Sequence, residues 1–221
     1  MKDLVVLGAG GSAGSIVELI GAINSVSLNW RLLGFLDDDP ALAGTTLHGM
    51  QVLGPIDHAI SMASSAFVIG VANYKRPSQR RDIAIRLNLP PERFATLIHP
   101  LASISNDSAI GRGVLIFPFA VVSDGASIGD HAFISQFCFV EHDSSLGDGT
   151  VMAPRSSLSG RSRLGADAFA GAHSVLRERI SVGEGAVVGM GAVVVSDVGP
   201  GETVVGNPAR PFVRREASRP G

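Results

Sequence analysis

The chain has 221 residues, of which 45% are hydrophobic and 17% charged, and its 18 Lys and Arg against 20 Asp and Glu leave a formal charge of -2. This composition excludes a disordered chain and argues against a nucleic-acid-binding protein, and no apolar run approaches the ~20 residues of a membrane span. The single cysteine, Cys138, excludes an internal disulfide framework and fits a cytoplasmic protein, and the early polar and glycine residues lead us to expect no signal peptide.

Residues 1–90 are expected to form a small α/β domain. Residues 4–7 are typical of a short buried strand, residues 8–14 form a glycine-rich turn, and a helical pattern opens at Ser15. A second strand over 32–36 ends in three aspartates, a third strand covers 66–70, and residues 78–87 have a helical pattern. A strand, glycine turn, helix and second strand with a terminal acid predict the start of a doubly wound parallel sheet.

The glycine turn is open to three interpretations. Its pattern, Gly8-x-Gly10-x-x-Ala13, is a permissive form of the dinucleotide fingerprint, in which N–H groups at a helix start face a pyrophosphate. The acid that ends the second strand lies about thirty residues on, somewhat beyond the usual ~20 of that fingerprint. A structural turn, a nicotinamide site and a sugar-nucleotide site therefore compete, and the second half of the chain favours the last.

From Ile98 onward the sequence has a period of six. Every sixth residue from Ile98 to Val194 is apolar, and the residue two places before each is usually small. Such a period fits short strands separated by corners, with one large aliphatic side chain pointing inward per face. Five of the 27 glycines recur every eighteen residues: Gly111, Gly129, Gly147, Gly165 and Gly183. Three hexads would then make one triangular coil, with these glycines stacked at a corner that requires a positive φ or close backbone approach.

The hexads over residues 98–195 resemble the left-handed parallel β-helix of the hexapeptide-repeat acyltransferases. With the glycine turn and the acids after Phe35-Leu36, the chain is similar to one group of these enzymes, the sialic-acid O-acetyltransferases and nucleotide 4-amino-sugar N-acetyltransferases. The resemblance implies an α/β Rossmann-like domain over 1–90 that binds a nucleotide sugar, followed over 91–197 by an all-β left-handed parallel β-helix. It also implies that residues 198–221 close a coenzyme groove and end in a polar tail.

The same resemblance implies that three loops of the first domain hold the nucleotide sugar. Their matching residues are Gly10, Gly11, Ser12, Asp37, Asp38, Asn73, Tyr74 and Arg76. Some members have a histidine where this chain has Ser12, so one contact is missing or replaced. Tyr74 and Arg76, which follow Asn73, either face the phosphates or form a solvated turn.

Acetyl transfer from a thioester to an amine needs a base with a pKa near neutrality, and histidine is the obvious candidate. His142 lies two residues past the inward Val140, near a corner, and is followed by a carboxylate. The segment Glu141-His142-Asp143 resembles the family's Glu-His-Glu/Asp segment, which implies that His142 is the catalytic base and Asp143 its support. Glu141 is the alternative support.

The remaining histidines offer weaker candidates. Where some relatives have a second histidine at the thioester, nine positions after the first, this chain has Val151, for which His173 is a possible substitute. We interpret His99 as the entry to the β-helix and His131 as structural. The γ-class carbonic anhydrases share the fold, but their zinc ligands include a His-x4-His pair that this sequence lacks, so we expect no metal.

The resemblance further implies a homotrimer, with acetyl-CoA bound between neighbouring β-helices. The positions that match this groove are Gly160, Ala172, Gly189, Pro208 and Arg210, and Arg177 and Arg179 are weaker candidates.

The expected function is therefore acetyl-CoA-dependent N-acetylation of the C4 amine of a nucleotide-linked 4-amino-4,6-dideoxy sugar, by direct transfer. The resemblance places it in the biosynthesis of lipopolysaccharide or another surface glycan, in the cytoplasm, with no nucleic-acid or membrane partner. Three alternatives stay open: O-acetylation of a sialic acid or other sugar hydroxyl, a nucleotide-binding scaffold without turnover, and an NAD-dependent oxidoreductase.

Overall fold

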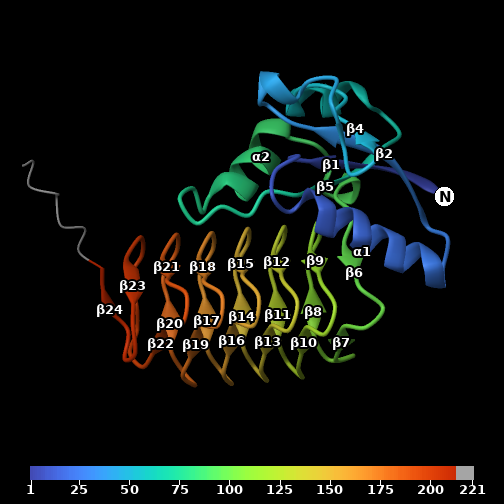
Figure 1. Ribbon diagram of the computed structural model, residues 1–221. Coiled ribbons are helices and arrows are strands. Elements are labelled where there is room, and N and C mark those ends of the chain that lie inside the picture. The colour runs from blue at the N-terminus through green and yellow to red at the C-terminus, as the bar shows by residue number, and fades with distance from the viewer. Residues whose placement is uncertain (213–221) are drawn as a thin grey trace, which may run out of the picture.

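A computed structural model, described for residues 1–212, has an α/β domain seated on a long prism of short strands (Figure 1). The predicted fold class, an α/β domain followed by a β-helix, is confirmed. The expected polar tail lies, from residue 213 onward, outside the described residues. Within residues 1–212 no helix is both long and apolar enough to cross a membrane.

The α/β domain is built on a three-stranded parallel sheet in the order β2-β1-β5. Its strands are β1 (Lys2–Leu7), β2 (Trp30–Leu36) and β5 (Ala66–Ile69), and α1 (Ala13–Val26) follows the glycine turn after β1. The second helix, α2 (Gln79–Leu87), follows β5. The carboxyl ends of the three strands meet at one edge of the sheet, which is where open α/β sheets bind ligands.

Short elements fill the rest of this domain. They are η1 (Pro40–Leu42), the antiparallel hairpin of β3 (Thr46–Leu47) and β4 (Met50–Gln51), η2 (Ile56–Ser61) and η3 (Pro91–Arg93). Two-residue strands are too short to show a period, so the sequence did not reveal the hairpin.

The prism consists of two-residue strands that pair in parallel with strands eighteen residues away, in three sheets that we name faces A, B and C. Face A contains β6 (Leu97–Ile98), β9 (Leu115–Ile116), β12 (Phe133–Ile134), β15 (Val151–Met152), β18 (Phe169–Ala170), β21 (Val187–Val188), β23 (Thr203–Val205) and the antiparallel β24 (Arg210–Pro211). Face B contains β7 (Ser103–Ile104), β10 (Val121–Val122), β13 (Phe139–Val140), β16 (Ser157–Leu158), β19 (Val175–Leu176) and β22 (Val193–Val194). Face C contains β8 (Ala109–Ile110), β11 (Ser127–Ile128), β14 (Ser145–Leu146), β17 (Arg163–Leu164) and β20 (Ser181–Val182).

The hexad positions form the interior of the prism, as predicted. From Ile116 to Val194 none of these side chains is more than 4% exposed. The small residue two places earlier also points inward, since Ala120, Cys138 and Ser156 are 0% exposed. Each face therefore puts two side chains per coil into a narrow triangular section, and close packing limits one of them to a small residue.

The stacked glycines owe their identity to close approach alone. A Cβ on Gly147 would lie 2.4 Å from the backbone nitrogen of Ala166, and one on Gly129 would lie 2.6 Å from that of Asp148. Of the two reasons expected for these glycines, close approach applies and a positive φ does not, because the left-handed residues recur every six positions from Gly113 to Gly191, at different sites. Many residues at the left-handed corners are not glycine, so the sequence has no glycine signal that would predict these corners.

Face A carries the α/β domain. The outward side chains Leu115, Phe133 and Val151 are buried in one cluster with Leu4 and Ile16 of the domain. The buried apolar area is the main attraction between the two parts of the chain.

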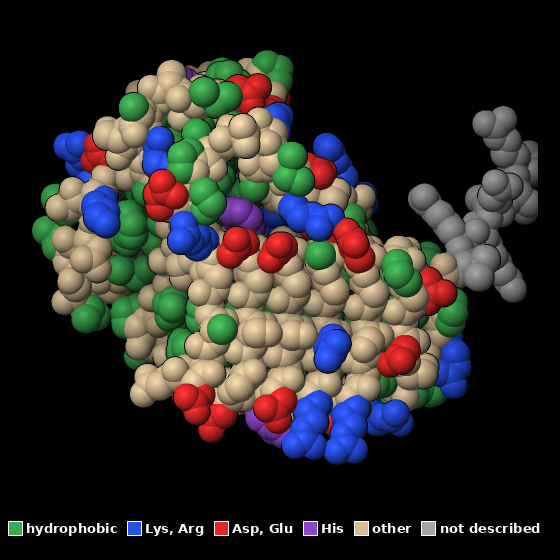
Figure 2. All heavy atoms as spheres, turned by 180° about the vertical axis from the view of Figure 1, so that it is seen from behind, with side chains coloured by type: hydrophobic (Ala, Val, Ile, Leu, Met, Phe, Trp, Pro, Cys, Tyr) green, Lys and Arg blue, Asp and Glu red, His purple; other side chains and the backbone are tan. Residues whose placement is uncertain are grey.

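A seam of charges borders this interface, where acidic side chains on the prism face basic ones above them (Figure 2). Arg81 of α2 lies 2.7 Å from Asp167 and 2.6 Å from Glu184. Asp167 is almost fully buried, and burial raises its pKa to about 6 despite the opposing charge of Arg81.

We predict that Gly147→Ala destabilises the prism by about 1–3 kcal/mol, because the new methyl group has to displace backbone in the next coil. The matched control is Gly21→Ala in α1, where a Cβ meets nothing within 4 Å. In a helix that change is neutral or stabilising by up to ~1 kcal/mol. Chemical denaturation of both variants measures the difference, and equal stabilities would contradict the account of the stack.

The raised pKa of Asp167 predicts a pH dependence of stability. Its value of about 6 in the folded chain exceeds the ordinary 3.8, so between these values the folded state binds more protons than the unfolded state. The contribution of Asp167 to stability is thus greatest at low pH, falls as pH rises through this window, and is constant above it. We expect the unfolding free energy of the wild type to fall relative to that of Asp167→Asn as pH rises from 4 to 7. A wild-type advantage that grows with pH would mean that the Arg81 ion pair outweighs burial.

Candidate functional site

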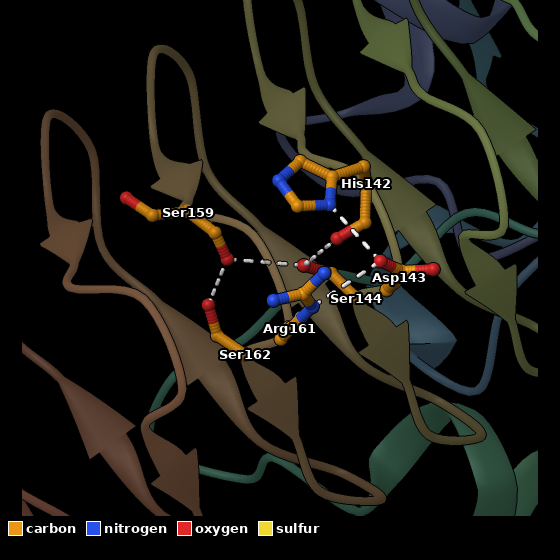
Figure 3. A network of polar contacts seen from close by, with 6 residues as sticks. All are labelled: His142, Asp143, Ser144, Ser159, Arg161 and Ser162. Atoms are coloured by element: carbon orange, nitrogen blue, oxygen red, sulfur yellow. Dashed lines mark hydrogen bonds and ion pairs between the residues drawn. The ribbon is translucent and has the colours of Figure 1, made fainter.

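The predicted catalytic pair lies at the edge between faces B and C, in the corner that joins β13 to β14 (Figure 3). Residues 141–144 form a tight turn in which the N–H of Ser144 donates to the carbonyl of Glu141 at 3.3 Å, and Asp143 has a left-handed φ of 57°. His142 Nδ1 lies 3.0 Å from Asp143 Oδ2. Both side chains are about half exposed, at 54% and 55%, so the pair is open to a ligand.

Asp143 is suited to orient the imidazole. The hydrogen bond from His142, together with the nearby guanidinium of Arg161, holds the pKa of the Asp143 carboxyl below its ordinary value. An ionised carboxylate only accepts hydrogen bonds, so Nδ1 is the donor and Nε2 of the neutral ring keeps its lone pair. Of the two acids that flank His142, Asp143 makes this contact. Its role as the support of a catalytic base stays a prediction.

Gly160 lies under the ring, one coil further along the same edge. A Cβ at this position would be 2.4 Å from His142 Nε2 and 2.8 Å from Cε1, so the ring rests on bare backbone. The hydroxyls of Ser144 and Ser162, inside the prism, both donate to the carbonyl of Ser159 and hold the backbone next to Gly160 (Figure 3). The resemblance placed Gly160 in the coenzyme groove, and its contact with His142 was not anticipated.

Arg161 is a residue that the sequence analysis did not name. Its Nε lies 3.4 Å from Asp143 Oδ2. Gly160 and Arg161 follow His142 and Asp143 by eighteen residues, which is one coil. The coil period, applied to side chains at the corner, would have found both contacts.

The glycine turn is open, and the fold does not require glycine at its tip. A Cβ at Gly10 or Gly11 would meet nothing within 4 Å. Ser12 is the N-cap of α1 but makes no side-chain cap hydrogen bond, and the first turn of the helix contains no acid. Free N–H groups at a helix start without a cap suit an anion such as a diphosphate.

The two predicted acids brace the neighbouring loops. Asp37 accepts from the N–H of Ala9 at 2.7 Å and from that of Asp39 at 2.8 Å, which ties the loop after β1 to the loop after β2. Asp38 accepts from Ile56 N–H at 3.0 Å and pairs with Arg86 at 2.8 Å. Contact of either acid with a ligand stays a prediction, in which their remaining lone pairs would take part.

The third loop reaches from the α/β domain onto the prism. Asn73 closes a turn by accepting from Lys75 N–H at 3.0 Å and from Arg76 N–H at 3.1 Å. Tyr74 is 55% exposed and packs against Phe169 of β18, with ring centroids 6.1 Å apart. The structure thus brings the three predicted substrate loops to one edge of the sheet, above face A.

The predicted coenzyme residues do not share a groove within one chain. Gly160 lies at the edge between faces B and C, whereas Ala172 and Gly189 lie at the edge between faces A and B. Pro208 is exposed just beyond the last coil, and Arg210 donates from Nη1 to the carbonyl of Ala209 at 2.7 Å. One chain therefore does not bring these predicted coenzyme residues together, and their role stays a prediction.

Val151, which stands where some relatives have a second histidine, and its possible substitute His173 both lie away from the edge that carries His142. Val151 is buried under the α/β domain on face A, and His173 sits at the edge between faces A and B. His142 lies in the corner between β13 and β14, which is the edge opposite face A, so the substrate loops and His142 lie on different sides of the prism. Figure 1 shows the α/β domain over face A, away from β13. In residues 1–212 no three His, Cys, Asp or Glu side chains form a group that could hold a metal ion.

The first part of the chain matches a family model described as the PglD N-terminal domain, over residues 3–87. A curated relative from Bacillus subtilis (strain 168), named UDP-N-acetylbacillosamine N-acetyltransferase, is 33% identical over 121 residues. This match covers 52% of the chain and 51% of the relative, so it spans about half the length of that protein.

Solved structures match over nearly the whole chain. The acetyltransferase domain of PglB from Neisseria gonorrhoeae FA1090 is 30% identical with a TM-score of 0.82, and the match covers 96% of this chain and 100% of that one. The same domain has been solved in complex with acetyl coenzyme A. PerB from Caulobacter crescentus, solved with CoA and GDP-perosamine, has a TM-score of 0.82 at 24% identity, covering 96% and 98% of the two chains, which shows a shared fold.

The contact between Gly160 and the imidazole predicts that Gly160→Ala moves the His142 ring and leaves the prism intact. The φ of Gly160 is not left-handed, and the new methyl group would meet the free end of a side chain, which can rotate away. The expected result is a broken Nδ1–Oδ2 hydrogen bond in a crystal structure of the variant, together with shifted His142 ring resonances and a nearly unchanged Tm. An unmoved ring would show that the backbone yields instead.

Proposed function

This chain belongs to the PglD-type hexapeptide-repeat acetyltransferases, and from that membership we propose that it transfers the acetyl group of acetyl-CoA to the C4 amine of a nucleotide-linked 4-amino-4,6-dideoxy sugar. The Bacillus relative is named for N-acetylation of a UDP-linked sugar, and the gonococcal domain binds acetyl coenzyme A. The observation that carries the proposal is the His142–Asp143 pair. Asp143 contacts Nδ1 of the exposed imidazole and leaves Nε2 free of that contact, and the ring packs against the backbone of Gly160.

In the proposed reaction, His142 Nε2 takes a proton from the sugar amine as the nitrogen attacks the thioester carbonyl. Asp143 holds the ring and stabilises the imidazolium that results. Collapse of the tetrahedral adduct breaks the C–S bond and forms the N-acetyl sugar. Coenzyme A leaves as a thiolate, which takes the proton from the His142 imidazolium and so restores the base. Direct transfer agrees with the state of Cys138, which is buried inside the prism, where burial raises its thiol pKa to about 11.

A complete site needs more than one copy of the chain. The substrate loops lie above face A, His142 lies at the opposite edge, and Ala172 and Gly189 lie at a third position around the prism. We therefore propose a homotrimer in which the His142 edge of one copy faces the substrate loops and the A/B edge of the next, with acetyl-CoA in the groove between them.

Face B supplies the apolar surface that such an assembly would bury. Its outward side chains include Val121, Phe139, Val175 and Val193, of which Phe139 is 41% and Val175 39% exposed in the single chain. Ser157 interrupts these apolar side chains, but the exposed aromatic and aliphatic groups on either side of it support burial of the face between copies.

The experiment that tests the reaction is thiol release from acetyl-CoA against UDP-, GDP- and dTDP-linked 4-amino-4,6-dideoxy sugars. We expect turnover with one of them, and His142→Asn should lower kcat/KM for that sugar by about 10²–10⁴-fold, because a positioned base contributes that much. Acetyl-CoA should bind the variant as it binds the wild type. The control is His58→Asn, an exposed histidine in η2, which should leave kcat/KM unchanged.

Other outcomes would redirect or overturn the proposal. Full activity of His142→Asn would mean that another group is the base. Silence with every amino sugar, while acetyl-CoA still binds, would favour a hydroxyl acceptor such as a sialic acid. Failure to bind acetyl-CoA at all would overturn the acetyltransferase assignment.

A further inference from the structure

Arg80, the second residue of α2, is a charged side chain buried between the α/β domain and the prism. It is 1% exposed and is among the largest fully buried side chains of the chain. No carboxylate pairs with it among residues 1–212, and its Nη2 has no hydrogen-bond partner there. Burial lowers its pKa to about 9, which still leaves it protonated at neutral pH. A buried cation without a counter-ion is costly to the fold, so its contacts need an explanation.

The guanidinium joins three carbonyl groups from two parts of the molecule. Nη1 donates to Ile69 O at 2.6 Å and to Val71 O at 2.7 Å, and Nε donates to His131 O at 2.6 Å. The first two carbonyls lie at the carboxyl end of β5, and the third lies in a left-handed corner of the prism. The ring of Phe133 on face A lies 5.3 Å from Cζ and adds a cation–π contact.

The carbonyls of Ile69 and Val71 flank Gly70, which touches the glycine turn. A Cβ at Gly70 would lie 3.1 Å from Gly8 O, and the Gly70 N–H donates to Leu7 O at 2.7 Å. Three residues further on is Asn73, where the third substrate loop turns. A shift of residues 69–71 would therefore move two of the three substrate loops together.

We infer that Arg80 is a positioning residue, which fixes the substrate loops of the α/β domain relative to the prism. This inference rests on the proposed function, in which those loops carry the nucleotide sugar to a histidine outside their own domain. Because an error of about 1 Å in placing reacting groups can cost on the order of 10² in rate, a rigid link between the two parts is useful. The apolar cluster on face A resists separation but is non-directional. The hydrogen bond from Arg80 Nε to His131 O is directional, and it ties residues 69–71, which the other two bonds hold, to one corner of the prism.

Arg81 provides the matched control. It belongs to the same turn of α2 and also links the domain to the prism, through Asp167 and Glu184, yet it contacts none of the three carbonyls. Removing Arg81 loosens the docking without touching residues 69–71. Arg80→Lys, Arg80→Met and Arg81→Met thus separate positioning of the loops from docking alone.

The first measurement is amide hydrogen exchange over residues 70–76 in the full-length protein. We expect faster exchange in Arg80→Met, an intermediate effect in Arg80→Lys because an ammonium group can reach fewer of the carbonyls, and wild-type protection in Arg81→Met. If Arg80→Met does not fold, Arg80→Lys carries the comparison. Unchanged protection in Arg80→Lys, or equal loss in the Arg81 variant, would overturn the inference.

The second measurement is steady-state kinetics with the active sugar. In the Arg80 variants the KM for the nucleotide sugar should rise about tenfold or more, or kcat should fall by a similar factor, while the KM for acetyl-CoA stays the same. Equal changes in both KM values would indicate a general structural role and overturn the inference. A wild-type protein without turnover would contradict the proposed function, whereas the exchange experiment would still decide the role of Arg80.

Discussion

The stacking of eighteen-residue coils at strand spacing is the constraint on which the rest of this molecule depends. Backbones approach so closely at Gly129 and Gly147 that no side chain fits between coils. The same stacking places every residue directly beside the residue one coil later. This eighteen-residue offset places the imidazole of His142 over Gly160 and the carboxylate of Asp143 beside Arg161. A site built on such a scaffold is held by backbone hydrogen bonds on both sides, which is the rigidity that proton transfer requires.

The parts of the fold that the sequence predicted are those where packing repeats. An inward aliphatic every sixth residue is a strong signal because each face meets the same interior, and this is why the prism could be recognised from Ile98 onward. The left-handed corners were not predicted, because a residue such as His131 or Arg161 adopts that conformation under the constraint of the coils on either side. Tertiary context there overrides the local preference for glycine.

The candidate site was predicted only as far as local motifs reach. The His142–Asp143 contact joins neighbours in the sequence, so a linear motif is able to record it. The distribution of the other residues among different edges depends on counting corners around a triangle, which a linear motif does not record. Arg80 was hidden for another reason: an arginine in a helical pattern is ordinarily solvated, and only the docking of α2 on face A buries it.

The end of the prism has a consequence for its length. A parallel solenoid is an open stack, and its final strands offer unpaired backbone groups to any further strand, including one from another molecule. Here β24 turns back and pairs antiparallel with β23 in the sheet of face A, after the last hexad at Val194. This reversal covers the exposed ladder of that face with a strand that contains Pro211, which has no N–H to donate. A further strand therefore cannot extend the ladder of face A at this end in the way that each coil extends the one before it.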